Sequence, residues 1–383
     1  MQKSQRRLHS MACAILCTLL IGSVTGCSQP TETPAPISVL PSPQPTLHPT
    51  MQGFRLPEWM TLELPPKCSA GSVSQDSNWI TYSCRLGNGG YRDWVAHIEA
   101  GQIISATDIT YDPWKFRVGF SIDNSGLLIL KGSDRCELLD LLTYSRQTCP
   151  GRIRAFSHST ANDWSPDGTS FIVASGPFTD VLISNLSNLN SPISIQKFED
   201  NGTLFSWSPD SRALVFVDGF LSSDENSMQA RIYYLDKRSP KTIFKGEHLT
   251  GASWSPNGKW IAVRELGDEP TTTIIHLIDL ESNTTARYEF QGLHSTKDAK
   301  DGWSDLVWSP DSSRLVVDGW DPISKSNWIV IKVPSGKTVF RATEYASQIK
   351  GWDAQGKNLL ITQWNSDTES DILKWIPVSI SDQ

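Results

Sequence analysis

The side chains of this sequence that could hold a metal or move a proton are its histidines. The main domain has five of them: His97, His158, His248, His276 and His294. A metal site needs three or four side chains that converge on one point. His158 and His248 each lie six residues before a repeated tryptophan, but the other three do not share this position. We therefore expect no metal and no other cofactor.

Sequence motifs of enzyme active sites are missing. The sequence has no Gly-x-Ser-x-Gly elbow, phosphate-binding glycine loop, His-Glu-x-x-His motif or EF-hand loop. Such motifs place a nucleophile, a phosphate or a metal at a fixed spacing. Since no catalytic residue can be named, we expect a binding or scaffold module without catalytic activity.

Aromatic, acidic and histidine side chains between the predicted strands are the candidate binding residues. Large aromatic rings with a polar rim are typical of a binding surface. The alternative is that these rings only cover the ends of the strands. The candidates are Trp114, His158, Phe178, Asp218, Phe220, His248, Trp303, Asp318, Trp320 and Trp364.

The elements that position these residues repeat along the chain. Clear copies begin at Trp164 (WSPDG), Trp207, Trp254 and Trp308, and degenerate copies begin at Val73, Phe120 and Trp352. Successive copies are 47, 44, 43, 47, 54 and 44 residues apart. This spacing is the size of one four-stranded propeller blade. Seven copies therefore predict an all-β fold, a seven-bladed β-propeller of four-stranded antiparallel blades, over residues 54–383.

Each copy has the residues of a β-hairpin turn followed by a buried strand. Proline fixes φ at the second turn position, Asp or Asn suits the third, and Gly or Ser follows in the left-handed conformation. Apolar runs after the turns, such as Leu315–Val317, predict strands buried on both faces. The repeated tryptophan is then expected to pack between blades, and Cys136–Tyr144 is expected to be a strand rather than a helix.

This WSPDG turn, followed by a strand ending in Asp-Leu as in Ile274–Leu280, resembles the TolB-type, WD-repeat-like propeller repeat. The resemblance covers residues 57–383 and implies that the motif turn joins the channel-lining first strand of a blade to the second. The motif turns then lie on one face of the propeller. The connections from the second to the third strand, and from the last strand of one blade to the first of the next, lie on the opposite face. We call this the loop face, and the candidate binding residues fall there.

The resemblance also implies the main alternative function. Some propellers similar to TolB resemble oligogalacturonate lyases, in which a histidine cluster holds a metal at the channel mouth. The alternative is therefore a glycan-active lyase or hydrolase with its site at the channel mouth. A third hypothesis is an architectural part of an envelope complex.

The ring is expected to close with strands from both ends of the chain. Asn358–Thr362 and Ile372–Val378 are predicted as the second and third strands of blade seven. No fourth strand follows them, so we expect Trp59–Leu64 to supply it. Such closure would cover both open edges of the ring.

The first 53 residues have the composition of an export signal and a tether. Three basic residues precede the apolar run Met11–Val24, which is too short to span a bilayer. The run ends in Val24-Thr25-Gly26-Cys27, which resembles the lipobox of bacterial lipoproteins. We predict a signal peptide over 1–26 and a lipidated proline-rich tether over 27–53, with Cys27 as the lipid acceptor. An ordinary signal peptide with a chance cysteine is the alternative.

Four cysteines remain in the predicted propeller, and an even number in an exported chain favours disulfides. In blade one, a hairpin centred near Gln75 and Asp76 places Cys68 opposite Cys84. The second predicted pair, Cys136 and Cys149, spans a hairpin of blade two.

Charge limits the partners. Removal of the signal peptide leaves 31 basic and 41 acidic residues, a formal charge of −10. An acidic chain without a basic cluster is a poor candidate for binding nucleic acid. We expect a monomeric propeller outside the cytoplasm that is held to a bacterial membrane by its lipid and binds an unknown protein, peptide or glycan.

The lipid anchor gives the first prediction. Cys27→Ser should move the protein from the membrane fraction to the soluble fraction, because it removes the acyl chains, which are the only predicted attachment of the mature chain to the bilayer. Fractionation and mass spectrometry of the mature N-terminal peptide test this. An unmodified Cys27 on mature, membrane-bound protein would contradict it.

Overall fold

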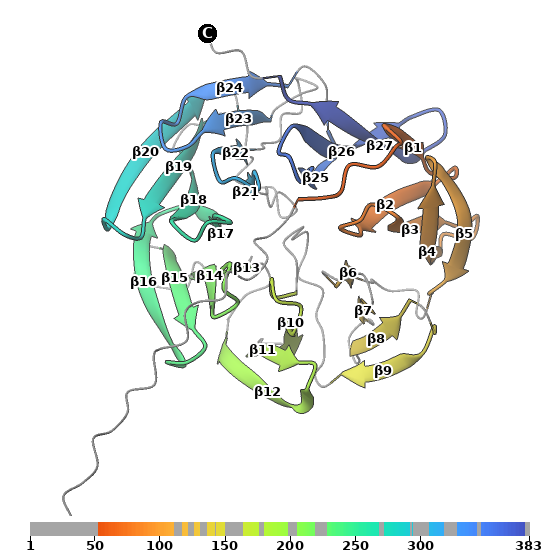
Figure 1. The fold of residues 1–383 in the computed structure, drawn as a ribbon, viewed down its shortest axis with the longest axis horizontal. Coiled ribbons are helices and arrows are strands. Elements are labelled where there is room, and N and C mark those ends of the chain that lie inside the picture. The colour runs from red at the N-terminus through yellow and green to blue at the C-terminus, as the bar shows by residue number, and fades with distance from the viewer. Residues whose placement is uncertain are drawn as a thin grey trace, which may run out of the picture. The chain divides into compact units, whose positions relative to one another are not determined.

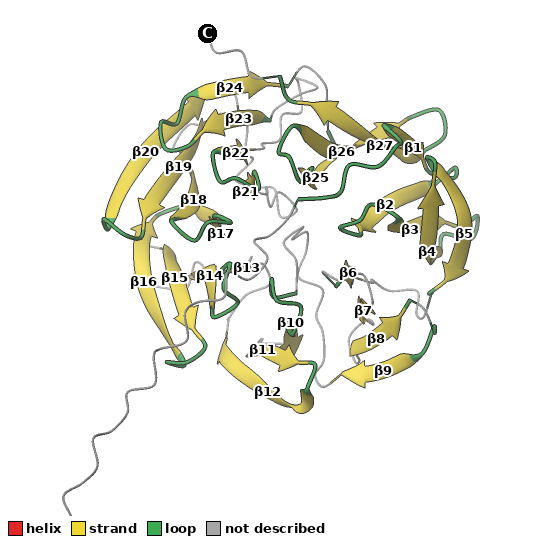
Figure 2. Ribbon diagram, in the orientation of Figure 1, coloured by secondary structure: helices red, strands yellow, loops and turns green. Residues whose placement is uncertain are grey.

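The computed structural model describes residues 53–110, 117–121, 126–130, 136–141, 143–149, 164–175, 180–197, 205–218, 228–267, 272–291, 293, 306–317, 328–342 and 346–379. The chain divides into two compact units, Met1–Gln44 and Pro45–Gln383, and every described residue belongs to the second. The predicted signal peptide, Cys27 and the tether before Gly53 lie outside the described residues. In this described part, all regular elements are strands, and no helix is long and apolar enough to cross a membrane (Figure 2).

The described strands form seven antiparallel sheets that follow one another around a central axis (Figure 1). This arrangement is a β-propeller. We number the sheets from one to seven along the chain. Sheet one is β2 (Cys68–Val73), β3 (Trp79–Arg85), β4 (Tyr91–Glu99) and β5 (Gln102–Asp108). Sheet two is β6 (Arg117–Phe120), β7 (Gly126–Leu130), β8 (Cys136–Asp140) and β9 (Arg146–Cys149).

Sheet three has three described strands, β10 (Ser170–Ser175), β11 (Asp180–Asn185) and β12 (Asn188–Lys197). Sheet four is β13 (Phe205–Trp207), β14 (Ala213–Asp218), β15 (Met228–Tyr234) and β16 (Ser239–Gly246). Sheet five is β17 (Leu249–Trp254), β18 (Trp260–Leu266), β19 (Thr272–Asp279) and β20 (Thr284–Gln291). Sheet six is β21 (Leu306–Trp308), β22 (Arg314–Val317), β23 (Ile329–Lys332) and β24 (Thr338–Arg341).

Sheet seven combines strands from distant parts of the sequence. Its order is β25 (Gln348–Trp352), β26 (Asn358–Asn365), β27 (Ser370–Pro377) and β1 (Thr61–Glu63). β1 is antiparallel to β27, with Leu62 opposite Leu373. The backbone N–H of Trp375 donates to Met60 O at 2.9 Å, just before β1. The N-terminal strand is therefore the outer strand of sheet seven.

The motif turns have the conformation that the repeat predicts. In the described turns, the left-handed position has φ between 59° and 75°, at Ser77, Gly168, Ser211, Gly258, Ser312 and Gly356. The serine after the repeated aromatic or valine residue is buried and makes two hydrogen bonds. In sheet six, Ser309 Oγ donates to Asp311 Oδ1 at 2.6 Å and accepts from the backbone N–H of Arg314 at 2.9 Å. Ser74, Ser165, Ser208 and Ser255 make the same pair of bonds.

The repeated tryptophans are buried between sheets, as the sequence predicts. Trp352 Nε1 donates to Val307 O of sheet six at 3.2 Å, and Trp308 Nε1 donates to Ser253 O of sheet five at 3.3 Å. Trp164 makes the equivalent bond to Gly119 O at 3.4 Å. These three indoles join their own repeats to the inner strand of the preceding sheet, whereas Trp254 Nε1 donates to Gly258 O of its own turn at 3.2 Å.

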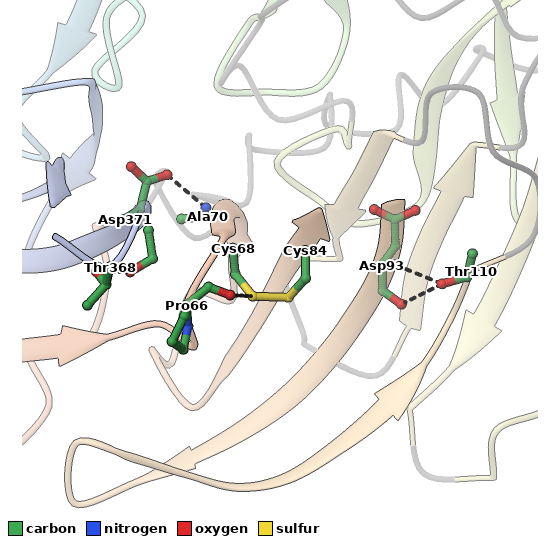
Figure 3. The surroundings of a disulfide bond; sticks show 9 residues. Pro66, Cys68, Ala70, Cys84, Asp93, Thr110, Thr368 and Asp371 are labelled. Atoms are coloured by element: carbon green, nitrogen blue, oxygen red, sulfur yellow. Dashed lines mark hydrogen bonds between the residues drawn. A yellow bond between two sulfur atoms is a disulfide. The ribbon is translucent and has the colours of Figure 1, made fainter. Parts of the chain in front are cut away.

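Cysteine positions follow the predicted registers. Cys68 lies opposite Cys84 in the β2–β3 pair, and the two form a disulfide (Figure 3). Cys136 lies opposite Cys149 in the β8–β9 pair. The side chains of this second pair lie outside the described part, so the disulfide between them stays a prediction. Cys136 lies in a strand, which confirms the prediction of strand over helix there.

The serine network gives a stability prediction. Ser309→Ala should lower the free energy of unfolding by about 1–3 kcal/mol, because it leaves the buried N–H of Arg314 without its acceptor. Ser335→Ala, at an exposed turn of the same sheet, is the control and should change stability by less than about 0.5 kcal/mol. Chemical denaturation measures both. Equal, small effects would show that the motif serine is dispensable.

Candidate functional site

The loop face carries the described candidate residues. Trp364 lies near the end of β26, Asp218 ends β14, and His248 precedes β17. All three positions lie at the ends of the sheets away from the motif turns, as predicted. They are in different sheets, however: Trp364 is in sheet seven, Asp218 is in sheet four, and His248 adjoins sheet five. The other candidates lie outside the described residues: Trp114, His158, Phe178, Phe220, Trp303, Asp318 and Trp320.

Trp364 is a large aromatic side chain that stays exposed, with 49% of its surface accessible. On β26 it shares a face with Thr362, and Asp371 is its partner on β27. That face packs on sheet one, because Leu360, Leu373 and Trp375 share a core cluster with Ile80 and Tyr82. The ring of Trp364 therefore extends from the top of a buried interface into solvent.

Sheet seven contacts sheet one next to this tryptophan. Asp371 Oδ2 accepts the backbone N–H of Ala70 at 2.9 Å, so the third strand of sheet seven lies against β2, the inner strand of sheet one (Figure 3). Trp364 is on the second strand, which is closer to the channel than the third. It lies opposite Asp371 at the end of β26 that is away from the motif turn, and its ring stays exposed.

Two polar side chains of the inner strand β25 accompany this tryptophan. Lys350 Nζ donates to Gly71 O of sheet one at 2.7 Å and also to Gln348 Oε1. Gln348 is exposed and is the partner of Thr362 in the β25–β26 pair, one position along the same face from Trp364. We call Gln348, Lys350 and Trp364 the mouth cluster, since they lie where the inner strands meet the loop face.

Asp371 is the buried acid beneath this cluster and is 8% exposed. Burial raises the pKa of its carboxyl group, while the hydrogen bond from Ala70 and the charge of Lys350 act in the opposite direction. A second half-buried carboxyl group, that of Asp93 in sheet one, also has its pKa raised by burial. Its backbone is held by Thr110, so we assign Asp93 a structural role.

Two of the described histidines, His276 and His97, have side-chain partners that indicate a structural role. His276 Nε2 lies 2.6 Å from Glu265 Oε2 in sheet five, and its ring packs on Phe244 of sheet four with 4.2 Å between centroids. His97 packs on Trp79 at 4.8 Å. Both lie in the third strands of their sheets. Among the described residues, no three His, Cys, Asp or Glu side chains are grouped to hold a metal ion.

Sequence reasoning found Trp364 but missed Gln348, Lys350 and Asp371. Each is a single polar residue within a predicted strand, and no motif surrounds it. Their association depends on the packing of sheet seven on sheet one. A strand register for β25, β26 and β27 would have placed Gln348 and Asp371 on the same face as Trp364.

Comparison with known proteins gives the fold. No family model matches the chain, and no curated protein matches it. A solved oligogalacturonate lyase in complex with manganese has 13% identity and a TM-score of 0.60, over 86% of this chain and 98% of that chain. At this identity the likeness shows the fold alone. The chain is a β-propeller.

Two further solved structures are similar to this propeller. An oligogalacturonate lyase from Vibrio parahaemolyticus has 12% identity and a TM-score of 0.56, over 85% of this chain and 92% of that chain. A chain of the mitotic checkpoint complex has 15% identity and a TM-score of 0.54, over 91% and 99%. The propeller architecture is thus shared by proteins whose functions differ.

The buried acid gives a pH prediction. Because the pKa of Asp371 is higher in the folded than in the unfolded chain, protonation favours folding, and this contribution is lost as pH rises through the folded pKa. Asp371→Asn keeps an acceptor for Ala70 without the charge. The variant should be at least as stable as wild type at neutral pH, with an advantage that shrinks in acid.

Thermal unfolding across a pH series measures this effect. Asp367→Asn, in the exposed turn between β26 and β27, is the control and should follow wild type throughout. The contrary result would be a variant that is less stable than wild type at neutral pH and loses this disadvantage in acid. It would show that the carboxylate charge stabilises the interface.

Proposed function

We propose that this chain is an exported, lipid-anchored binding module that recognises a protein, peptide or glycan through its loop face at the channel mouth. The observation that carries the proposal is the exposed ring of Trp364, left uncovered beside Gln348 and Lys350 where sheets seven and one meet. Rigid aromatic rings supply much of the affinity at binding surfaces at a small entropy cost.

The proposed architecture is a closed ring of seven blades of the TolB type, with β1 as the outer strand of the seventh. The seven described sheets and the β1–β27 pairing support this proposal. In such a ring, the remaining candidates, among them Trp114, Trp303 and Trp320, would surround the same channel mouth. Loops that are not needed to hold a scaffold are where binding residues concentrate.

Attachment and partner class remain part of the proposal. The lipid at Cys27 would hold the domain outside the cytoplasm, and the proline-rich tether would separate it from the bilayer. The acidic net charge argues against nucleic acid as a partner. We propose a monomeric propeller.

Partner capture tests the binding function. Trp364→Ala should weaken capture of envelope components about 10- to 100-fold, because it removes an aromatic anchor without changing the buried interface. Tyr144→Ala is the matched control: Tyr144 is 45% exposed, but it lies in the turn between β8 and β9, on the motif-turn face. Circular dichroism checks that both variants fold.

The proposal would be contradicted if the effects of the two substitutions on partner capture were exchanged. If Trp364→Ala captures partners as wild type does while Tyr144→Ala does not, the binding surface is on the motif-turn face. Partners that bind both variants equally would indicate recognition through the outer edges of the sheets, as an architectural component would use.

A glycan-active enzyme is the second candidate, because two of the structural neighbours are oligogalacturonate lyases. Incubation of the purified protein with oligogalacturonates and manganese, followed by ultraviolet detection of unsaturated sugar ends, tests it. We expect no turnover. Product formation that depends on the metal would favour the enzyme over the binding module.

A further inference from the structure

We propose that residues 53–55 clamp the chain to the motif-turn face, so that this face is directed toward the anchoring membrane and the mouth cluster away from it. The partner of the mouth cluster is then a component on the far side of the domain from the bilayer. This inference rests on the proposed lipid anchor and binding function, and it adds the orientation in which the domain meets its partner.

The first half of the clamp is a pair of backbone hydrogen bonds to sheet seven. The N–H of Phe54 donates to Trp352 O at 2.8 Å, and Phe54 O accepts the N–H of Ala354 at 2.7 Å. Trp352 and Ala354 lie at the motif turn between β25 and β26. The chain before β1 is therefore held at the motif-turn end of sheet seven.

The second half of the clamp is on sheet one. The N–H of Arg55 donates to Gln75 O at 2.7 Å, and Arg55 O accepts from Ser77 Oγ at 2.8 Å. Gln75 and Ser77 belong to the motif turn between β2 and β3. Two consecutive residues are thus bonded to the motif turns of two neighbouring sheets.

Two glycines permit this close approach. A Cβ atom on Gly53 would lie 2.5 Å from Asp353 O, and one on Gly351 would lie 2.7 Å from Phe54 Cε2. Both separations are well below the roughly 3.5–4.0 Å of a favourable contact between carbon atoms. The ring of Phe54 also meets Trp375 edge to face, with 6.2 Å between centroids. A larger residue at position 53 would push the chain off sheet seven.

The clamp decides where the proposed tether leaves the domain. The described chain before β1 runs outward from near the central axis (Figure 1). The tether therefore joins the domain at the motif-turn face. Without the clamp, the nearest fixed point would be Met60, whose carbonyl accepts from Trp375 in the interior of β27. The chain would then leave from the side of sheet seven, with neither face favoured.

Tether stiffness converts this exit point into an orientation. The proposed tether has 26 residues before Gly53, of which seven are proline. As polyproline II it would reach about 80 Å, at about 3.1 Å per residue. To bring the loop face to the bilayer, this semi-rigid chain would have to bend around the edge of the domain, which costs conformational entropy.

The mouth cluster is at the other end of sheet seven from the clamp. Gln348 begins β25 and Trp364 is near the end of β26, whereas the clamp bonds to the turn between these strands. In this orientation the mouth cluster is turned away from the anchoring bilayer. It fits a protein, peptide or glycan that is not embedded in that membrane.

Energy transfer from the domain to the bilayer tests the orientation. The full mature lipoprotein is placed in phosphatidylcholine vesicles that contain an acceptor-labelled lipid. A donor dye is attached through p-azidophenylalanine at Gln355, in the motif turn of sheet seven, or at Asp367, in its β26–β27 turn. Both positions are exposed, and the eight residues of β26 between them span about 26 Å. We expect transfer from position 355 to be about 2-fold stronger or more.

Gly53→Val tests the clamp itself and should remove most of this difference, because its side chain cannot fit against Asp353 O. Gly87→Val is the matched control, since a Cβ there would meet no heavy atom within 4 Å, and it should keep the wild-type difference. Circular dichroism checks that both variants fold.

Equal transfer from the two positions, or stronger transfer from position 367, would overturn the orientation. A folded Gly53→Val protein that keeps the wild-type difference would overturn the role of the clamp. Transfer from neither position would overturn the lipid anchor as well. If Trp364→Ala captures envelope components normally while the orientation is as expected, the binding function fails and the orientation stands.

Discussion

The packing of each sheet on the next is the interaction on which this structure depends. The central strands are buried on both faces and rich in apolar residues: every residue of β19 is buried, and Ile261, Ala262 and Val263 of β18 are fully buried. A sheet with two apolar faces cannot be stable alone in water, because each face must be covered. The hydrophobic clusters accordingly extend across neighbouring sheets, as between sheets four and five.

Polar groups of the motif set the alignment of this apolar packing. The serine hydroxyl satisfies the N–H that opens the second strand, and the indoles of Trp164, Trp308 and Trp352 donate to the inner strand of the preceding sheet. Buried donors and acceptors that are paired cost little, whereas unpaired ones are expensive. Hydrophobic burial therefore drives the association of the sheets, and the motif fixes their register. The mouth cluster lies at the edge of this packing, where Lys350 bonds to sheet one and the ring of Trp364 stays exposed.

Much of the fold could be predicted because its determinants are local and repeated. The spacing of the motif located the strands, including Cys136–Asp140, and the hairpin centre near Gln75 gave the Cys68–Cys84 pair. The site was harder to predict. Trp364 could be predicted because it is an aromatic residue just after a predicted strand. Lys350 and Asp371 could not, because their place in the site depends on contacts with residues far away in the sequence. Lys350 contacts Gly71, about 280 positions away, and Asp371 contacts Ala70, about 300 positions away. The His276–Glu265 pair likewise depends on a strand register that no motif marks.

The N-terminal strand β1 is the outer strand of sheet seven, and we propose that it holds this sheet against sheet one and so positions the mouth cluster. Native-state hydrogen exchange of the backbone amides of Leu64, Ala70 and Trp375 tests it most directly, because these amides donate across the β1, β2 and β27 contacts. We expect these amides to exchange only through global unfolding, as slowly as those of Ile261 and Ile275 in the middle of sheet five. Rapid exchange of these three amides by local opening, while sheet five stays protected, would contradict it.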